Sequence, residues 1–207
     1  DDWYGITPGT DGLLILSLVH ELLTAGRIDL DYLARYTNAP CLVDETEGDE
    51  KGLLLRDELG KPLVIDRVTG APAPYDQRGI RPDLGATWKG CRTVFQHLSE
   101  RYLSADYAPE AVADRCGIDA GDIRALAAEI ADAAFNHPVE IAQPWTDFRG
   151  ERHGTMPGRP VSFHAMRGIS AHSNGFQTAR ALHVLQILLG AVEVPGGFRF
   201  KPPYPKP

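Results

Sequence analysis

The residues of this chain best suited to chemistry lie in Gly168-Ile-Ser-Ala-His-Ser-Asn-Gly175, a polar loop bounded by glycines. A strongly apolar segment, residues 176–190, follows at once and predicts a helix that begins where the loop ends. Free backbone N–H groups and small polar side chains should therefore converge at this helix start. Such a place suits a phosphate group or the edge of a heteroaromatic ring. A purely steric role for the glycines is the alternative.

A second candidate is Asp11, in the segment Ile6-Thr-Pro-Gly-Thr-Asp-Gly12. Thr10 or Asp11 can cap a helix that continues to about residue 25, so the Asp11 carboxylate lies at the start of that helix. It could act only as a cap that favours the helix dipole. A carboxylate beside a glycine turn could instead accept two hydrogen bonds from the N1–H and N2–H₂ groups of a guanine.

The elements that must position these residues are mostly helices. Apolar periodicity predicts helices over 11–25, 30–36, 94–103, 109–115, 123–135 and 176–190, with Asp29 and Asp119 as caps and Pro109 in a first turn. Strands are expected at 138–142 and 160–164. Residues 42–89 read as a surface insertion with short β-like pieces at 53–55 and 62–65, joined by a hairpin connection at 57–60. A disordered loop is the alternative for that insertion.

Together these elements predict an α/β fold. We expect a single domain over 1–207, a three-layer Rossmann-like part-domain with helices around a short, mostly parallel sheet. The irregular, β-containing insertion 42–89 interrupts it, and a proline-rich linker, 198–207, follows it. The predicted strands are too few for an independent doubly wound sheet, so part of this domain is expected outside the sequence.

Composition excludes several classes of function. The net charge is −7 and the lysines and arginines are scattered, which argues against nucleic acid as a partner. The longest apolar run, residues 13–19, is too short to span a bilayer, so no membrane insertion is expected. Cys41, Cys91 and Cys116 have no metal-ligand spacing, and we expect them to act as small hydrophobic residues.

Several motifs, in order, resemble the cofactor-binding middle region of the molybdopterin oxidoreductases of the dimethyl-sulfoxide-reductase superfamily. They are the Pro8-Gly-Thr-Asp11 turn with its apolar helix, residues 26–38, Tyr107-Ala-Pro-Glu-Ala-Val-Ala113, Gly117-Ile118, residues 123–129, Arg180-Ala-Leu182, Leu188-Leu-Gly190 and Pro195-Gly-Gly197. The long acidic insertion and the Arg167-Gly168 loop look most like the branch acting on sulfur oxyanions, such as sulfite dehydrogenases and thiosulfate or polysulfide reductases.

The resemblance implies a cofactor and the residues that hold it. The cofactor would be one of the two molybdopterin guanine dinucleotides of a bis-molybdopterin molybdenum centre. The residues that match the family's contacting segments are Pro8, Gly9, Thr10, Asp11, Gly168, His172, Ser173, Asn174 and Gly175. His172 could also face substrate as a proton carrier, and Arg167 could bind a phosphate or an oxyanion, or simply pair with a local carboxylate.

The resemblance also implies what this piece lacks. The family's N-terminal cysteine motif for a [4Fe–4S] cluster and its molybdenum-ligand segment are absent, so the isolated piece should be inactive, with no catalytic or metal-binding residue of its own. Expected partners are the rest of the catalytic polypeptide, an electron-transfer subunit with Fe–S clusters, and a membrane-anchor subunit. Localisation stays open between the cytoplasmic and periplasmic sides of a bacterial membrane, with the cytoplasmic side favoured.

Two other functions remain open on the residues alone. One is a nucleotide-binding transferase or hydrolase domain using Asn174-Gly175 and the following helix, although no nucleophile with a spaced base is evident. The other is a non-enzymatic interaction module whose proline-rich end binds a partner. Trp145 and Phe148 near Arg149 could form a stacking platform, although aromatic residues at turns more often cover the edge of a core.

Overall fold

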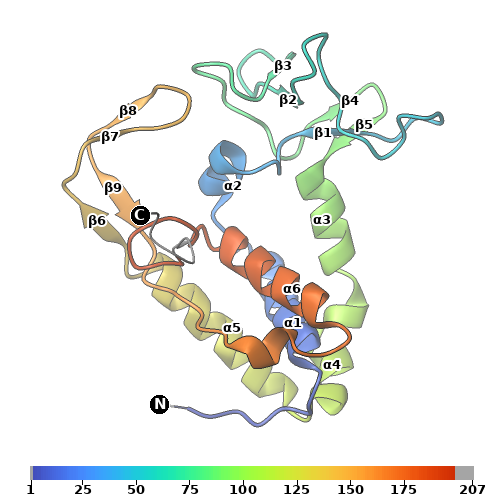
Figure 1. The fold of residues 1–207 in the computed structure, drawn as a ribbon, viewed down its shortest axis with the longest axis vertical. Helices are drawn as coiled ribbons and strands as arrows, with labels where there is room; N and C mark the ends of the chain where they lie inside the picture. The colour runs from blue at the N-terminus through green and yellow to red at the C-terminus, as the bar shows by residue number, and fades with distance from the viewer. Residues whose placement is uncertain (1, 199–207) are drawn as a thin grey trace, which may run out of the picture. The chain divides into compact units, whose positions relative to one another are not determined.

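The computed structural model describes residues 2–198 and combines helices with short strands in a mixed α/β fold (Figure 1). The chain divides into two compact units. Unit 1 comprises Asp1–Ile28, Tyr102–Ala142 and Thr155–Pro207, and unit 2 comprises Asp29–Arg101 and Gln143–Gly154. The expected linker, 198–207, lies outside the described residues apart from its first residue.

Unit 1 is built around helix α1 (Asp11–Thr24). It packs against α4 (Pro109–Cys116), α5 (Ala120–Phe135) and α6 (Gly175–Leu188) (Figure 1). A short 3₁₀ helix, η1 (Ala105–Tyr107), precedes α4. Ile15, Leu18, Val19 and Leu22 of α1 are all buried. This confirms that α1 is buried on more than one face, as its largely apolar circumference predicts.

The predicted local start signals are confirmed. Asp29 caps α2 (Leu30–Tyr36) by accepting a hydrogen bond of 2.8 Å from the Tyr32 N–H. Asp119 caps α5, which begins three residues earlier than predicted, and Pro109 is the first residue of α4. These groups satisfy or remove donors that a helix start leaves free, so the sequence alone identifies them.

The strands of unit 1 differ from the expectation. β6 (Val139–Ile141) is found where predicted and pairs with β9 (Met156–Gly158) in antiparallel fashion. The strand predicted at 160–164 is wrong, because that segment has no ladder partner among the described residues. Val161 is buried, so its apolar character reflects packing and not strand pairing. Every pairing between named strands is antiparallel, and the described residues contain no mostly parallel sheet.

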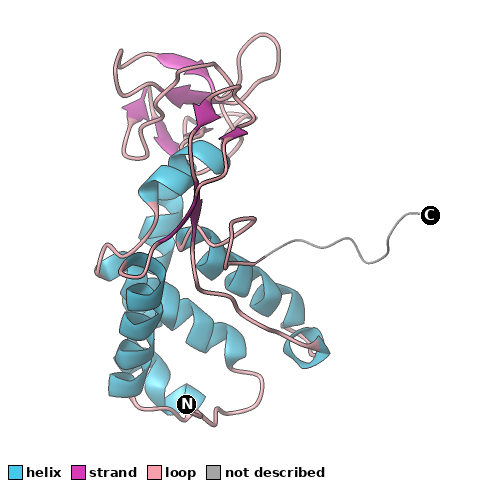
Figure 2. Ribbon diagram, turned by 90° about the vertical axis from the view of Figure 1, so that its left-hand side faces the viewer, coloured by secondary structure: helices cyan, strands magenta, loops and turns pink. Residues whose placement is uncertain are grey.

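Unit 2 consists of short antiparallel strands joined by long loops, together with α2 and most of α3 (Val94–Tyr102) (Figure 2). β1 (Leu42–Asp44), β5 (Cys91–Thr93) and β4 (Thr87–Trp88) form a sheet of order β1-β5-β4. β2 (Leu63–Ile65) pairs with β3 (Pro72–Pro74), and β7 (Trp145–Thr146) pairs with β8 (Arg152–His153). Segment 42–89 therefore has a defined fold, and the disordered alternative is wrong.

The β-like pieces predicted inside that segment are only partly strands. The piece at 62–65 becomes β2, whereas the piece at 53–55 makes only the isolated bridge between Val43 and Leu54. The connection between them is confirmed by the 3.0 Å bond from Gly60 N–H to the Asp57 carbonyl and the bridge between Arg56 and Pro62.

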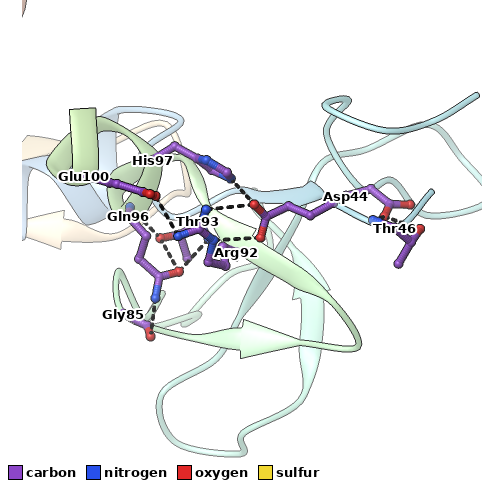
Figure 3. Close-up of polar contacts among 9 residues, drawn as sticks. Asp44, Thr46, Gly85, Arg92, Thr93, Gln96, His97 and Glu100 are labelled. Atoms are coloured by element: carbon purple, nitrogen blue, oxygen red, sulfur yellow. Dashed lines mark hydrogen bonds and ion pairs between the residues drawn. The ribbon is translucent and has the colours of Figure 1, made fainter. Parts of the chain in front are cut away.

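An ion-pair network fastens the β1–β5 sheet to α3 (Figure 3). Arg92 on β5 donates to Glu45 through Nε at 2.7 Å and Nη2 at 2.8 Å, and to Glu100 on α3 through Nη1 at 2.8 Å. Hydrogen bonding from Arg92 lowers the pKa of Glu45. This two-pronged geometry suits an arginine and a carboxylate.

The three cysteines behave as small hydrophobic residues, as predicted. Cys41 packs with Val64 and Ile80, Cys91 belongs to a second buried cluster in unit 2, and Cys116 is fully buried in unit 1. Burial raises the pKa of the Cys41 and Cys91 thiols, which disfavours the thiolate needed for ligation. In residues 2–198, no helix has the length and apolar character that a bilayer crossing requires.

A candidate cofactor site at two helix starts

The turn before α1 leaves the Asp11 carboxylate free. The Thr7 carbonyl accepts from Thr10 twice, at 3.2 Å from its N–H and at 2.6 Å from its hydroxyl, while Gly9 takes the left-handed φ of 83° that the turn requires. Thr10 precedes the helix, but its side chain makes no cap bond. Asp11 is the first helical residue, and its carboxylate has no hydrogen-bond or ion-pair partner among residues 2–198. The expected side-chain cap is thus not made.

The second loop folds tightly on itself. Arg167–Ser170 form one turn of 3₁₀ helix (η2), and the Ala171 N–H donates to the Gly168 carbonyl at 3.2 Å. The His172 ring contacts the Asn174 side-chain oxygen, and the His172 carbonyl accepts from the Gly175 N–H at 2.9 Å. The loop thereby orients its polar side chains before α6 begins.

The two outer glycines of this loop have different roles. A Cβ on Gly175 would lie 2.1 Å from the Ser170 carbonyl oxygen, so the loop can close only on glycine. A Cβ on Gly168 would meet nothing within 4 Å. Gly175 is therefore fixed by the fold of the loop itself, whereas Gly168 leaves space for a ligand.

The two motifs, far apart in sequence, meet in unit 1. The Asn174 side-chain amide donates to the Gly9 carbonyl at 3.3 Å. One turn further on, a Cβ on Gly12 would approach the Thr178 hydroxyl to 2.8 Å, which shows how closely the first turns of α1 and α6 pack. The starts of the two helices consequently lie side by side.

This juxtaposition creates a surface that favours negative charge. The N–H groups of Phe176 and Gln177, in the first turn of α6, donate to no acceptor in the described part of the chain. The positive ends of two helix dipoles add to these free donors. The Asp11 carboxylate stands at the edge of the same surface, where it can accept donors but would repel an anion.

The structure brings most, but not all, of the predicted residues together. Gly9, Thr10, Asp11, His172, Asn174 and Gly175 surround the two helix starts, with Pro8 and Ser173 exposed beside them. Gly168 is exposed at the far end of the loop. The exposed Arg167 side chain makes no ion pair within the described ranges, so its expected contact with a site carboxylate is not seen.

Two residues that position the site were missed in the sequence. Thr7 holds the turn through its carbonyl, and its N–H donates at 2.8 Å to the Cys116 carbonyl at the end of α4. Thr178 packs against Gly12, and its hydroxyl donates to the Asn174 carbonyl at 3.2 Å. A threonine four residues after the helix start was the available signal for the second, because its hydroxyl reaches back one turn.

Comparison with curated proteins gives the family. The chain is 42% identical over 222 aligned residues to a sulfite dehydrogenase subunit of Allochromatium vinosum, an alignment that covers 100% of the chain. It belongs to the molybdopterin oxidoreductases. It is also 30% identical to a dimethyl sulfoxide reductase catalytic subunit of Halobacterium salinarum over 61% of the chain, and 24% identical to the formate dehydrogenase major subunit of Haemophilus influenzae over 93%. The predicted family is confirmed.

The chain spans only part of these molybdopterin oxidoreductases. It covers 23% of the length of the sulfite dehydrogenase protein and 16% of each of the other two proteins. No family model matches the chain. It therefore corresponds to a segment of a larger redox enzyme, which argues against both a transferase or hydrolase domain and a purely structural module.

Proposed function

We propose that this chain is the part of a molybdenum oxidoreductase that binds one molybdopterin guanine dinucleotide at the starts of α1 and α6. The observation that carries the proposal is the 3.3 Å hydrogen bond from Asn174 to the Gly9 carbonyl, which joins the two motifs that the family resemblance singles out. A cofactor of this kind supplies the dithiolene sulfurs that bind molybdenum, so the redox chemistry belongs to the cofactor.

The donors present fit the two chemically different ends of such a ligand. The free N–H groups of Phe176 and Gln177 suit a pyrophosphate, because they add hydrogen bonds to the positive end of α6. Ser173 and Asn174 are exposed beside them and can donate to phosphate or pterin oxygens. His172 is fixed toward Asn174 and lies on the side proposed for the pterin.

Asp11 fits the guanine end and not the phosphates. Its half-buried carboxylate has no partner among residues 2–198 and can accept the N1–H and N2–H₂ donors of guanine together. Adenine presents no such pair of donors on this edge. Asp11 would thus select guanine, while Pro8, Gly9 and Thr10 hold the turn that presents it.

The remaining features of the parent enzyme are also proposals. We propose that its second guanine dinucleotide, molybdenum ligand and [4Fe–4S] cluster are held outside these 207 residues, and that strands from there complete a three-layer, Rossmann-like domain into which segment 42–89 is inserted. The match to one subunit of a sulfite dehydrogenase supports an assembly with a membrane-anchor subunit, together with an Fe–S electron-transfer subunit. The same match favours a sulfur oxyanion as substrate, on the cytoplasmic or periplasmic side of a bacterial membrane.

The test exchanges Asp11 in the full-length enzyme. Asp11→Asn keeps the size of the side chain but presents an NH₂ group to the guanine donors, so we expect the retained nucleotide to fall by about tenfold or more. The measurement is GMP released by acid hydrolysis per mole of protein, together with molybdenum content. Asp114→Asn, an exposed acid on α4, is the matched control and should leave both quantities unchanged.

A contrary result is easily recognised. If the Asp11→Asn enzyme retains as much GMP and molybdenum as the Asp114→Asn control, Asp11 does not bind guanine and the assignment of this end of the cofactor fails. Loss of nucleotide in both variants would show only general destabilisation, so thermal unfolding of each variant is measured alongside.

A further inference from the structure

A cluster of aromatic and cationic side chains in unit 2 lies outside the proposed cofactor site. It joins the end of α2 to the β7–β8 hairpin, and we call it the Tyr36 surface, made of Arg35, Tyr36, Phe148 and Arg149. The ring of Tyr36 lies 6.2 Å from that of Phe148, and the Arg149 guanidinium lies over Phe148 at 5.0 Å. The Tyr36 and Phe148 side chains are 37% and 56% exposed, although both are large and apolar.

The hairpin behind this surface is rigidly built. Asp147 accepts from the N–H groups of Arg149 and Glu151 at 3.0 and 2.9 Å through one oxygen, and its other oxygen contacts His153 Nε2 at 3.1 Å. His153 in turn stacks on Trp145 at 4.5 Å. Since the Asp147 carboxylate is satisfied in this way, it does not bind the Arg149 guanidinium. The predicted stacking of Trp145 and Phe148 is thus partly a hairpin core and partly an exposed platform.

Arg149 is a partly buried cation without a bound anion. Its Nε is buried and has no hydrogen-bond partner, and its guanidinium forms no ion pair in the described part of the chain. Burial lowers the pKa of Arg149, and the neighbouring charge of Arg35 lowers it further, while Asp147 and Glu151 oppose the shift. A bound carboxylate would compensate the desolvated charge and occupy both arginines at once.

We propose that the Tyr36 surface is a docking site for an acidic segment of another protein, with a carboxylate bound at Arg149 and Arg35 and an apolar side chain packed on Phe148 and Tyr36. Tyrosine, aromatic rings and arginine are the residues that most often dominate protein interfaces. The charge of the surface complements an acidic partner, even though the chain as a whole carries −7. The proposal does not depend on the cofactor assignment, because all its residues belong to unit 2.

The test places a photo-crosslinker on the surface. In the full-length enzyme expressed in its own host, Phe148 is replaced by p-benzoylphenylalanine, and the cross-linked peptides are sequenced by mass spectrometry after irradiation. We expect a peptide from a different polypeptide, with an aspartate or glutamate within about three residues of the cross-linked position. The same probe at Leu59, an 83% exposed apolar residue of unit 2, controls for random encounter. A probe at Tyr36 gives a second, independent reading.

Charge variants decide whether the arginine matters. Arg149→Gln should lower the cross-link yield by about fivefold or more, since it removes the charge that the partner carboxylate would meet. Arg152→Gln removes the same charge from the same hairpin and should not, because Arg152 precedes His153 on β8 and its side chain points to the opposite face. Equal yields in the two variants, cross-links confined to the enzyme's own polypeptide, or yields no higher than at Leu59 would each overturn the proposal.

Discussion

At the scale of single residues, glycine has two distinct uses in the loop before α6. Gly175 has no room for a side chain, because a Cβ there would overlap the Ser170 carbonyl, whereas Gly168 faces open space. The sequence shows two glycines that flank one polar loop and cannot distinguish them. Only the path of the backbone separates the steric explanation from the ligand-binding one.

The two positions therefore predict opposite results for the same change. Gly175→Ala should lower the free energy of unfolding by about 1–3 kcal/mol, since a backbone oxygen must move to admit the methyl group. Gly168→Ala should change it by less than about 0.5 kcal/mol. Denaturant unfolding of the full-length protein gives both values. A Gly168→Ala protein that keeps its stability but loses bound nucleotide would place Gly168 against the cofactor, and equal destabilisation by both changes would contradict this account.

At the scale of elements, the site depends on how closely α1 and α6 approach at their first turns. Gly12 permits that approach, because any Cβ there would meet the buried Thr178 hydroxyl at 2.8 Å. The same contact brings Gly9 to Asn174. Close packing of these two helix starts is thus a condition for the proposed binding surface, and it can be tested without any ligand.

A double-mutant cycle tests this packing. Gly12→Ala alone should destabilise the protein, because the methyl group forces the helix starts apart. In a Thr178→Ala background the same change should be neutral or stabilising by up to about 1 kcal/mol, since alanine is the better helix former once the obstruction is gone. The measurement is chemical unfolding of the four proteins. Additive effects would show that the two side chains do not oppose one another.

Sequence reasoning located the helices well for a physical reason. Asp29, Asp119 and Pro109 act on backbone groups within three residues of themselves, so their effect can be read locally. Strand pairing depends on partners that are distant in the chain. The alternation at 160–164 therefore imitated a strand, and the antiparallel pairing of β6 with β9 could not be foreseen. The meeting of Gly9 with Asn174 likewise needed the packing of α1 on α6, although the family resemblance had already named both segments.

At the scale of the whole molecule, the two units differ in how they hold their carboxylates. The acids whose pKa is lowered in unit 2 are Asp44, Glu45, Asp66, Asp76 and Asp147. Those in unit 1 are Glu110 and Asp132, each on an exposed helix surface. For Asp147 burial acts to raise the pKa, but the hydrogen bonds from Glu151, His153 and Arg149 outweigh it. Unit 2 relies more on ionised carboxylates to fix its loops.

The sign of the pH dependence follows from these shifts. A carboxylate whose pKa is lower in the folded protein stabilises it above its ordinary value, which is 3.8 for aspartate and 4.5 for glutamate, and that stabilisation is lost as the pH falls through the lowered value. We therefore expect unit 2 to open before unit 1 on acidification from about pH 5 to about pH 3. Protonation would release the Asp147 turn and the Arg92–Glu45 pair together.

Pepsin can report this order directly, because it is active over the same range of pH. In the full-length enzyme, cleavage within residues 29–101 and 143–154 should appear at a higher pH than cleavage within α1, α5 and α6. Since pepsin itself changes with pH, the informative quantity is the ratio of the two sets of fragments at each pH. Asp147→Asn provides the internal test: it should admit cleavage of the β7–β8 hairpin already at the highest pH and reduce the pH dependence there. Simultaneous cleavage of both units in the unaltered protein would contradict the expectation, because the two sets of carboxylates would then be titrating as one cooperative structure.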